Sequence, residues 1–201
     1  MFGNKPNTLT KALPLIYIIG GTVALMFSLL ITTEKAQLTA NPGYVPPCNI
    51  SPFISCGTVI LTPQASVFGF PNSLMGIAGF AALITIGVVL LAGAALPRWF
   101  WRGLQIGATL AAVFVYWLFF QSVYRIGTLC PYCMGVWAMT IPIFWYTTVY
   151  NLCQGHLPMP AWLGGAAGFL TRHHGLMLTV LFLVIVVAIL TRFWFYWVTL
   201  V

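Results

Sequence analysis

Charged side chains are scarce in this sequence, and acidic ones are almost missing. Charged residues make up 4% of the 201 residues, and Glu34 is the single acidic residue. A soluble domain typically has about 25% charged residues. Hydrophobic residues make up 61% of the chain. These values exclude a water-soluble globular protein and indicate a protein of the lipid bilayer.

The few basic residues lie singly in turns between apolar runs. They give a formal net charge of +7. Dispersed Lys and Arg residues are typical of membrane-topology signals, whereas a nucleic-acid-binding surface needs a clustered basic patch. We therefore expect membrane lipid as a partner and no nucleic acid.

Five apolar runs are long enough to cross a hydrocarbon core of about 30 Å, which takes roughly 20 helical residues. They cover approximately residues 13–33, 71–95, 103–124, 130–152 and 174–198. The first run is longer than the apolar core of a signal peptide, and no convincing A-x-A cleavage site follows it, so we expect it to be retained. The chain is predicted to form one all-α transmembrane domain over residues 1–201.

The basic residues also predict the orientation of the spans. An N-terminus inside the cell leaves five basic residues on the cytoplasmic side and three outside, in agreement with the positive-inside rule. The inner ones are Lys5, Lys11, Arg98, Arg102 and Arg172, and the outer ones are Lys35, Arg125 and Arg192. In this orientation Cys48, Cys56, Cys130 and Cys133 all lie on the outer, oxidising face, and Cys153 lies inside. We expect an inner or plasma membrane location with the site on the periplasmic or extracellular face.

The outer segment 36–70 is too long and too apolar for a simple connector. Its five prolines exclude a long helix, and its short apolar pieces predict half-helices that cover the bundle as a lid. The first span is predicted to end in the polar run Thr32-Thr33-Glu34-Lys35. At the start of the second span, Asn72 and Ser73 can either cap the helix or, in the case of Asn72, donate to a ligand carbonyl.

Small residues and prolines suggest where helices meet. Gly20-Gly21 and the pair Gly103 and Gly107 have spacings that favour close helix packing. Pro142 is expected to kink the fourth span and to open a pocket between neighbouring helices. Cys153, His156, His173 and His174 are too dispersed for us to expect a metal site.

Cys130-Pro131-Tyr132-Cys133 joins a polar turn to a long apolar helix. A C-x-x-C pair is compatible with zinc, haem attachment or redox chemistry, and free cysteines can also be plain buried side chains. With Thr128 as the predicted N-cap, the helix N-terminus favours a thiolate, and residues three apart lie on one face, so that the two sulfurs can form a disulfide. These features favour a redox dithiol.

Cys48 and Cys56 form a second pair within the lid. Cys48 follows Pro46-Pro47 and is expected on a stiff, solvated turn, whereas Cys56 precedes the apolar Val59-Ile60-Leu61. The pair can act as an electron shuttle or as a static disulfide that staples the lid. As a shuttle, it would pass electrons from a soluble thiol protein to Cys130 and Cys133. No haem, flavin or iron–sulfur signature occurs in the sequence, so a membrane quinone is the predicted acceptor.

The ordered combination of these motifs resembles the vitamin K epoxide reductase family in its bacterial form. The resemblance covers about residues 13–150. It rests on Cys48 and Cys56, the hydroxyl of Thr62, the segment Phe68-Gly69-Phe70-Pro71-Asn72-Ser73 and Cys130-Pro131-Tyr132-Cys133. It implies a four-helix transmembrane bundle around the quinone, with the fifth helix added, and a lid pair that exchanges with a thioredoxin-like protein.

The resemblance also implies a role for each site residue. Cys48 would face the partner, Cys56 would exchange with Cys130, and Cys133 would lie nearest the quinone. Asn72 would donate to a quinone oxygen, Thr62 would keep a hydroxyl where many members have Ser, and Trp137 would line the pocket where animal members have Tyr.

The predicted function is therefore that of a quinone-linked thiol–disulfide oxidoreductase that uses menaquinone or ubiquinone. Its partner is expected to be a separate DsbA-type protein, because the chain ends at Val201 without a thioredoxin-like domain. The other bacterial quinone-linked disulfide oxidase has the two pairs in the opposite order. A non-catalytic scaffold with a structural disulfide is the alternative from a different class.

Overall fold

The computed structural model describes residues 6–41, 43–157 and 164–195, and within them the regular structure is helical. Lys5 and residues 196–198 of the predicted last span lie outside these ranges. The elements in chain order are α1 (Pro6–Ala40), α2 (Cys56–Ile60), the 3₁₀ helix η1 (Pro63–Ser66), α3 (Asn72–Leu91), α4 (Arg98–Phe120), the π-helix η2 (Gln121–Ile126), α5 (Pro131–Cys153), α6 (Gly164–Arg172) and α7 (His174–Arg192).

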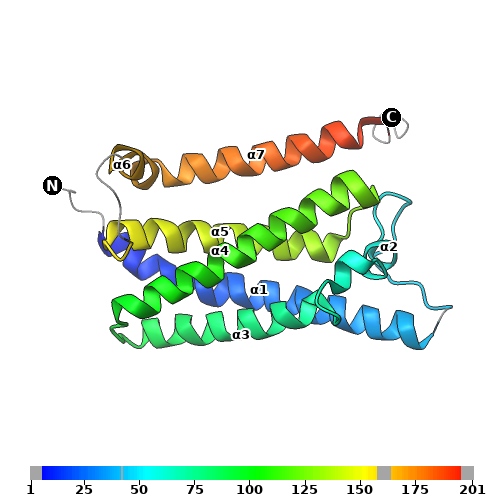
Figure 1. Ribbon diagram of the computed structural model, residues 1–201, viewed down its shortest axis with the longest axis horizontal. Coiled ribbons are helices and arrows are strands. Elements are labelled where there is room, and N and C mark those ends of the chain that lie inside the picture. Colours follow the sequence, from blue (N-terminus) through cyan, green and yellow to red (C-terminus); the bar gives the residue numbers. More distant parts are fainter. Residues whose placement is uncertain (1–5, 42, 158–163, 196–201) are drawn as a thin grey trace.

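Helices α1, α3, α4 and α5 form a bundle, and α7 lies along one side of it (Figure 1). Helix α1 packs against α3 and α5, and α5 also packs against α4. Helix α7 touches α5 and η2. The lid segment with α2 covers the end of the bundle where α1 ends and α5 begins (Figure 1). The expected four-helix bundle with an added helix is confirmed.

Among the described residues, four helical stretches are long and apolar enough to cross a membrane. They are Leu9–Ala40, Asn72–Leu91, Arg98–Ile126 and His174–Arg192. Helix α5 has 23 residues and is about 34 Å long, which also suffices for a hydrocarbon core of about 30 Å. Its lower hydropathy arises from polar residues such as Thr140, Thr147 and Asn151, which are buried inside the bundle. Because this lower hydropathy leaves α5 out of the four stretches above, the predicted span over 130–152 stays a prediction.

Some helices begin or end several residues away from the approximate bounds of the predicted spans. Helix α1 continues through Glu34 and Lys35 to Ala40. The lid allows this because it buries the Glu34 side chain and provides the Ser66 hydroxyl, to which Lys35 donates a hydrogen bond. Helix α3 ends at Leu91 instead of 95, and α4 begins at Arg98 instead of 103. Gly93, with a φ of 85°, makes the turn between them.

Glycines allow α1 to approach its neighbours closely. A Cβ atom on Gly21 would lie 2.9 Å from Ile84 of α3, and one on Gly20 would lie 3.3 Å from Ile143 of α5. The predicted packing role of Gly20-Gly21 is therefore confirmed. No atom of the described residues would lie within 4 Å of a Cβ at Gly103 or Gly107, so the described helices do not use this pair for close packing.

A polar network closes the end of the bundle that is opposite the lid. Asn151 donates to Gln105 Oε1 at 2.9 Å, and Gln105 donates to Thr148 at 2.9 Å. His156 Nδ1 lies 3.1 Å from Asn151 Oδ1, and its ring stacks on Trp101 at a centroid distance of 5.6 Å. Buried polar groups that bond one another in this way hold α4 to α5, because their hydrogen bonds offset the cost of removing them from water.

Candidate dithiol site

The lid is held together by side-chain hydrogen bonds around the start of α2. Ser55 is the N-cap, and its hydroxyl accepts from the Thr58 N–H. Asn49 Oδ1 accepts from the Ser55 hydroxyl and from the Gly57 N–H, both at 3.0 Å. These bonds satisfy the free N–H groups of Gly57 and Thr58 and hold the start of α2, where Cys56 lies, against Asn49.

Cys48 and Cys56 form a disulfide with a Cα separation of 5.6 Å. Cys48 lies in a turn, as predicted, but it is only 5% exposed. The predicted solvation of Cys48 is therefore wrong. The reason is that the disulfide packs inward against Val59 and Ile60 of α2.

Backbone pairing brings the lid against the start of α5. The Leu129 N–H donates to the Phe53 carbonyl at 2.8 Å, and the Ser55 N–H donates to the Leu129 carbonyl at 3.0 Å. A parallel bridge joins Ile54 to Leu129. The residues that follow Ser55 and Leu129 are Cys56 and Cys130, so this register places the two cysteines side by side.

The turn before α5 has its own fixed geometry. Gly127 adopts a φ of 71°, which favours glycine, and ends the π-helix η2. The Ser122 hydroxyl donates to the Thr128 carbonyl at 2.6 Å. Thr128 is therefore tied back to η2 and does not cap α5. The predicted cap is wrong, and Cys130 itself is the N-cap residue, with Pro131 in the first turn.

Cys130 is fully buried and free, and Cys133, one turn further along α5, is half-buried and free. The hydrogen bond from the Cys133 thiol lowers the pKa of Cys130 below its usual value, and the N–H groups of Cys133 and Tyr132 lower it further, against the opposing effect of burial. The position at the helix N-terminus therefore favours the thiolate of Cys130, as predicted.

The lid disulfide and Cys130 share one packed group, which we call the thiol cluster. Its buried members are Cys48, Cys56, Val59, Ile60 and Cys130, and it is flanked by Ile31, Leu38, Ile126, Tyr132 and Cys133. The lid disulfide therefore packs against Cys130, and the predicted exchange between the two cysteine pairs stays a prediction. Because these sulfur atoms pack within one apolar group, no layer of water separates them, and they can exchange disulfides directly.

Cys133 also borders a second group, which we call the aromatic cluster. Its buried members are Val115, Val123, Leu129, Trp137 and Phe193, with Phe119, Cys133, Met134 and Ile189 packed against them. The Phe119 and Trp137 rings meet edge to face with centroids 5.4 Å apart. Apolar and aromatic side chains therefore flank Cys133 on this side.

Asn72 and Thr62 belong to neither cluster. Asn72 Nδ2 donates to the Gln64 carbonyl at 2.7 Å, and its Oδ1 accepts from the Val67 N–H at 3.1 Å. Asn72 thus joins α3 to η1 instead of capping α3, whose N-cap is Pro71. The Thr62 hydroxyl donates to the Val59 carbonyl at 2.7 Å. The roles of both residues toward a quinone stay predictions.

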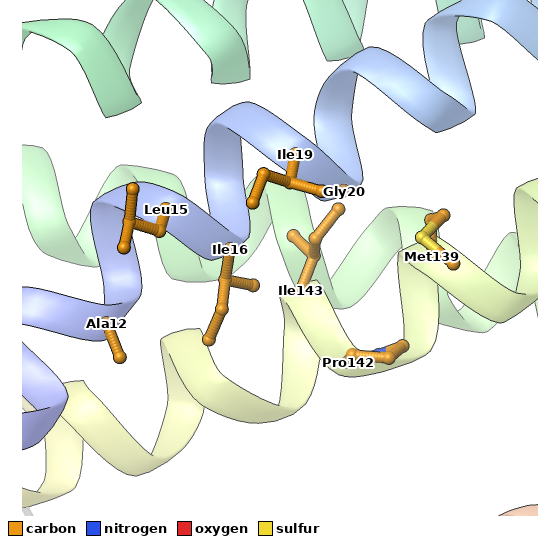
Figure 2. Close-up of a pocket in the computed structure, with 8 residues that line it drawn as sticks. All are labelled: Ala12, Leu15, Ile16, Ile19, Gly20, Met139, Pro142 and Ile143. Atoms are coloured by element: carbon orange, nitrogen blue, oxygen red, sulfur yellow. The ribbon is translucent and has the colours of Figure 1, made fainter.

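An apolar groove lies between α1 and α5 (Figure 2). Pro142, which was expected to open a pocket between neighbouring helices, lines part of it. It has a volume of about 350 Å³. Its lining residues are Ala12, Leu15, Ile16, Ile19, Gly20, Met139, Pro142 and Ile143. The α1 residues of the groove lie toward the N-terminal half of that helix, away from the lid.

The remaining thiol and the histidines lie far from the dithiol. Cys153 is the last residue of α5, and His156 belongs to the polar network at that end. The His174 carbonyl accepts from Trp145 Nε1 at 2.9 Å. Within the described ranges, no group of three or more Cys, His, Asp or Glu side chains is placed to hold a metal ion.

Sequence reasoning missed the residues that position the thiols. Asn49 and Ser55 carry the lid hydrogen bonds, Ser122 fixes the turn, and Leu129 provides the register. The one available signal was local: Ser55 stands directly before the short apolar stretch of α2, as N-cap residues do.

Comparison with known proteins agrees with this site. No curated protein matches the chain. The model of the vitamin K epoxide reductase family matches residues 15–148, about two thirds of the chain, and this segment contains both cysteine pairs, the lid and most of the four helices of the bundle. The members of this family are oxidoreductases of the membrane. The chain belongs to the vitamin K epoxide reductase family.

Proposed function

We propose that the protein is a quinone-dependent thiol–disulfide oxidoreductase. It reoxidises an extracytoplasmic DsbA-type, thioredoxin-like protein and passes the electrons to a membrane quinone, and so supports disulfide formation. The observation that carries the proposal is the register that puts the Cys48–Cys56 disulfide beside the free dithiol of Cys130 and Cys133. This arrangement is the one expected after electrons have passed from the lid pair to the inner pair.

The first exchange takes electrons from the partner. A partner thiolate attacks Sγ of Cys48, and Cys56 leaves as a thiolate; a second partner thiol then releases Cys48 and forms the partner's disulfide. Because Cys48 is buried, the partner has to displace part of the lid before it can reach this sulfur.

The second exchange moves the electrons inward. The Cys56 thiolate attacks Sγ of Cys130 in the Cys130–Cys133 disulfide, and Cys133 leaves as a thiolate. Cys48 then attacks Sγ of Cys56, which restores the lid disulfide and releases Cys130. Two electrons and two protons have moved from the lid pair to the inner pair. The lowered pKa of Cys130 makes it a good leaving group in this step.

The inner pair then returns to the disulfide. A bound quinone supplies an acceptor for two electrons and two protons. Cys133 is the proposed donor thiol, because it borders the aromatic cluster. Trp137 and Phe119 would hold the ring by their flat faces and keep water out. Asn72 has one amide N–H beyond the one that it donates to Gln64, and this group would bind a quinone oxygen.

The decisive experiment supplies purified protein in lipid nanodiscs with a reduced DsbA-type protein and a water-soluble quinone. We expect the quinone absorbance to fall, and we expect Cys130→Ala and Cys133→Ala to abolish the change. Cys153→Ala, which removes a thiol at the opposite end of α5, is the matched control and should keep the wild-type rate. Quinone reduction that survives Cys133→Ala would contradict the proposal. A wild-type protein that is inert but loses stability in the cysteine variants would favour a scaffold.

A further inference from the structure

We propose that Glu34 is the proton carrier of the dithiol site. In this role, which rests on the proposed function, it takes the proton from the attacking lid thiol and returns it to the thiolate that leaves. The carboxyl lies buried at the junction of α1, the lid and the start of α5, with one oxygen that lacks a hydrogen-bond partner among the described residues. Nothing in the exchange chemistry above uses this group.

Burial is the first reason to assign a role to Glu34. It is the single acidic residue of the chain, and it is 7% exposed. Burying a carboxylate is costly unless the group is paired, and ionisable groups within membrane proteins usually serve a function. The described structure places no salt bridge at this carboxyl, and Lys35, the next residue, points instead to Ser66. Packing alone would have been served better by an apolar side chain.

The helical register places Glu34 on the face of α1 that meets the thiols. Ile31 and Leu38, three residues before and four after it, both pack against the thiol cluster. Residues at this spacing lie on one face of a helix. One turn further back on α1, the Phe27 ring lies 6.1 Å from the Tyr132 ring, next to Cys133. Glu34 therefore projects between the lid and the first turn of α5.

Few other polar groups face this carboxyl. Tyr44 of the lid donates a hydrogen bond to one oxygen of Glu34. The titratable groups that come from the start of α5 are Cys130, Tyr132 and Cys133, and the lid adds the cysteine pair. Arg125 on η2 is exposed, so it offers the buried carboxyl no fixed cation.

The negative charges of Glu34 and of a Cys130 thiolate disfavour each other. The carboxylate of Glu34 raises the pKa of Cys130, which opposes the stronger effect of the Cys133 hydrogen bond. Glu34 is therefore close enough to act on Cys130 electrostatically. Transfer of a proton between a thiol and its carboxyl leaves the total charge of the site unchanged.

The proposed transfer balances at each step. The Glu34 carboxylate removes the proton of the Cys56 thiol, whose sulfur attacks Cys130 and breaks the Cys130–Cys133 bond; the Glu34 carboxylic acid then protonates the Cys133 thiolate. In the same way it takes the proton of Cys48 and gives it to Cys130. The two electrons move with the disulfide, the two protons move through Glu34, and Glu34 ends as it began.

The test follows the internal exchange without any quinone. Dithiothreitol is added to the fully oxidised protein, and samples are quenched in acid and alkylated. Mass spectrometry then measures the oxidation state of the lid pair and of the inner pair separately. Reduction of the lid pair by dithiothreitol is thereby distinguished from the transfer of electrons to the inner pair. We compare the wild type, Glu34→Gln, Glu34→Asp and Tyr44→Phe. The Tyr44→Phe variant is the matched control, because it removes the hydrogen bond to Glu34 but keeps the carboxyl.

General bases typically contribute about 10²–10⁴-fold to a rate, so we expect Glu34→Gln to slow the transfer at least tenfold at about pH 6.5. The deficit should close near about pH 9, where thiols ionise without help. Glu34→Asp should restore part of the rate, and Tyr44→Phe, which keeps the carboxyl, should transfer electrons faster than Glu34→Gln.

Wild-type transfer in Glu34→Gln across the pH range would overturn the proposal, and so would a Glu34→Asp rate no better than that of Glu34→Gln. If Glu34→Gln does not fold, a wild-type transfer rate that is equal in H₂O and D₂O overturns it as well. Failure of the proposed function gives a different result. Electrons then pass normally from the lid pair to the inner pair, but the protein reduces no quinone.

Discussion

The N–H of Ser55 donates to the carbonyl of Leu129 at 3.0 Å, and each of these residues stands directly before a cysteine of the site. The two residues are far apart in the chain, so the pairing of the lid with the last turn before α5 determines which sulfurs can meet. In a site that works by disulfide exchange, the backbone thus selects Cys56 as the lid sulfur beside Cys130.

The first prediction tests this register. Leu129→Pro removes the N–H that donates to the Phe53 carbonyl, and proline restricts the preceding residue as well. We expect the transfer of electrons from the lid pair to Cys130 and Cys133 to slow at least tenfold, measured by acid quench and mass spectrometry. Leu129→Ala is the control. It keeps the N–H and loses only side-chain packing, so transfer should persist while unfolding becomes easier by about 2–5 kcal/mol.

The second prediction concerns the acidity of Cys130. The hydrogen bond from the Cys133 thiol is the largest cause of its lowered pKa, so Cys133→Ala should raise that pKa. The pH midpoint of alkylation by iodoacetamide then moves upward, measured in a Cys153→Ala background with the lid disulfide intact. Cys133→Ser keeps a hydroxyl donor and should hold the midpoint closer to that of the wild type. Equal midpoints in the Ala and Ser variants would contradict this assignment.

The third prediction separates the two roles of Asn72. Asn72→Ala removes the hydrogen bonds to the exposed Val67 N–H and the half-buried Gln64 carbonyl, which should destabilise the junction of α3 with the lid by about 0.5–1.5 kcal/mol for each bond. If Asn72 also binds a quinone oxygen, the KM for quinone rises as well. Asn49→Ala removes two comparable hydrogen bonds within the lid. A KM increase of the same size in both variants would show that the loss is only structural.

The spans and the cysteine pairs were predictable because they are local properties of the sequence. Length and hydropathy locate α3 and α7, and spacing alone pairs Cys130 with Cys133. Other features depend on contacts between distant segments. The polar run around Glu34 looked like the end of a span, and only the lid above it explains why α1 continues to Ala40. Cys48 was expected to be exposed to water, because its position in the sequence does not reveal that residues of α2 cover it.

The predicted cap at Thr128 failed for a different physical reason. Threonine is a common N-cap residue, but the choice of cap depends on where the helix can begin. Pro131 is well suited to the first helical position, and this moves the cap to Cys130. The chemical consequence is unchanged, because both arrangements place a thiol at the positive end of the helix dipole.

The fourth prediction concerns the opposite end of the bundle. Burial lowers the pKa of His156, and Arg98 and Arg102 lower it further, so the folded protein favours the neutral ring. A base whose pKa is lowered on folding stabilises the protein above its unfolded pKa of about 6.5, and this contribution is lost as the pH falls. We expect the Tm in detergent to drop between about pH 7.5 and pH 5. His156→Gln should show a smaller drop, and an equal drop would contradict the assignment.

The final prediction compares two glycines that look alike in the sequence. A Cβ atom on Gly135 would lie 2.4 Å from Cδ2 of Phe27, so Gly135→Ala must push α1 away from α5 close to the dithiol. Overpacking of this kind costs about 1–3 kcal/mol, and the Phe27 ring would be forced off Tyr132. We therefore expect a lower Tm together with slower electron transfer. Gly103→Ala is the control, because open space surrounds its Cβ position and alanine favours the helix by up to about 1 kcal/mol. A loss of Tm in Gly103→Ala equal to that in Gly135→Ala would show that Gly103 packs against a surface outside the described residues, such as a second copy of the chain.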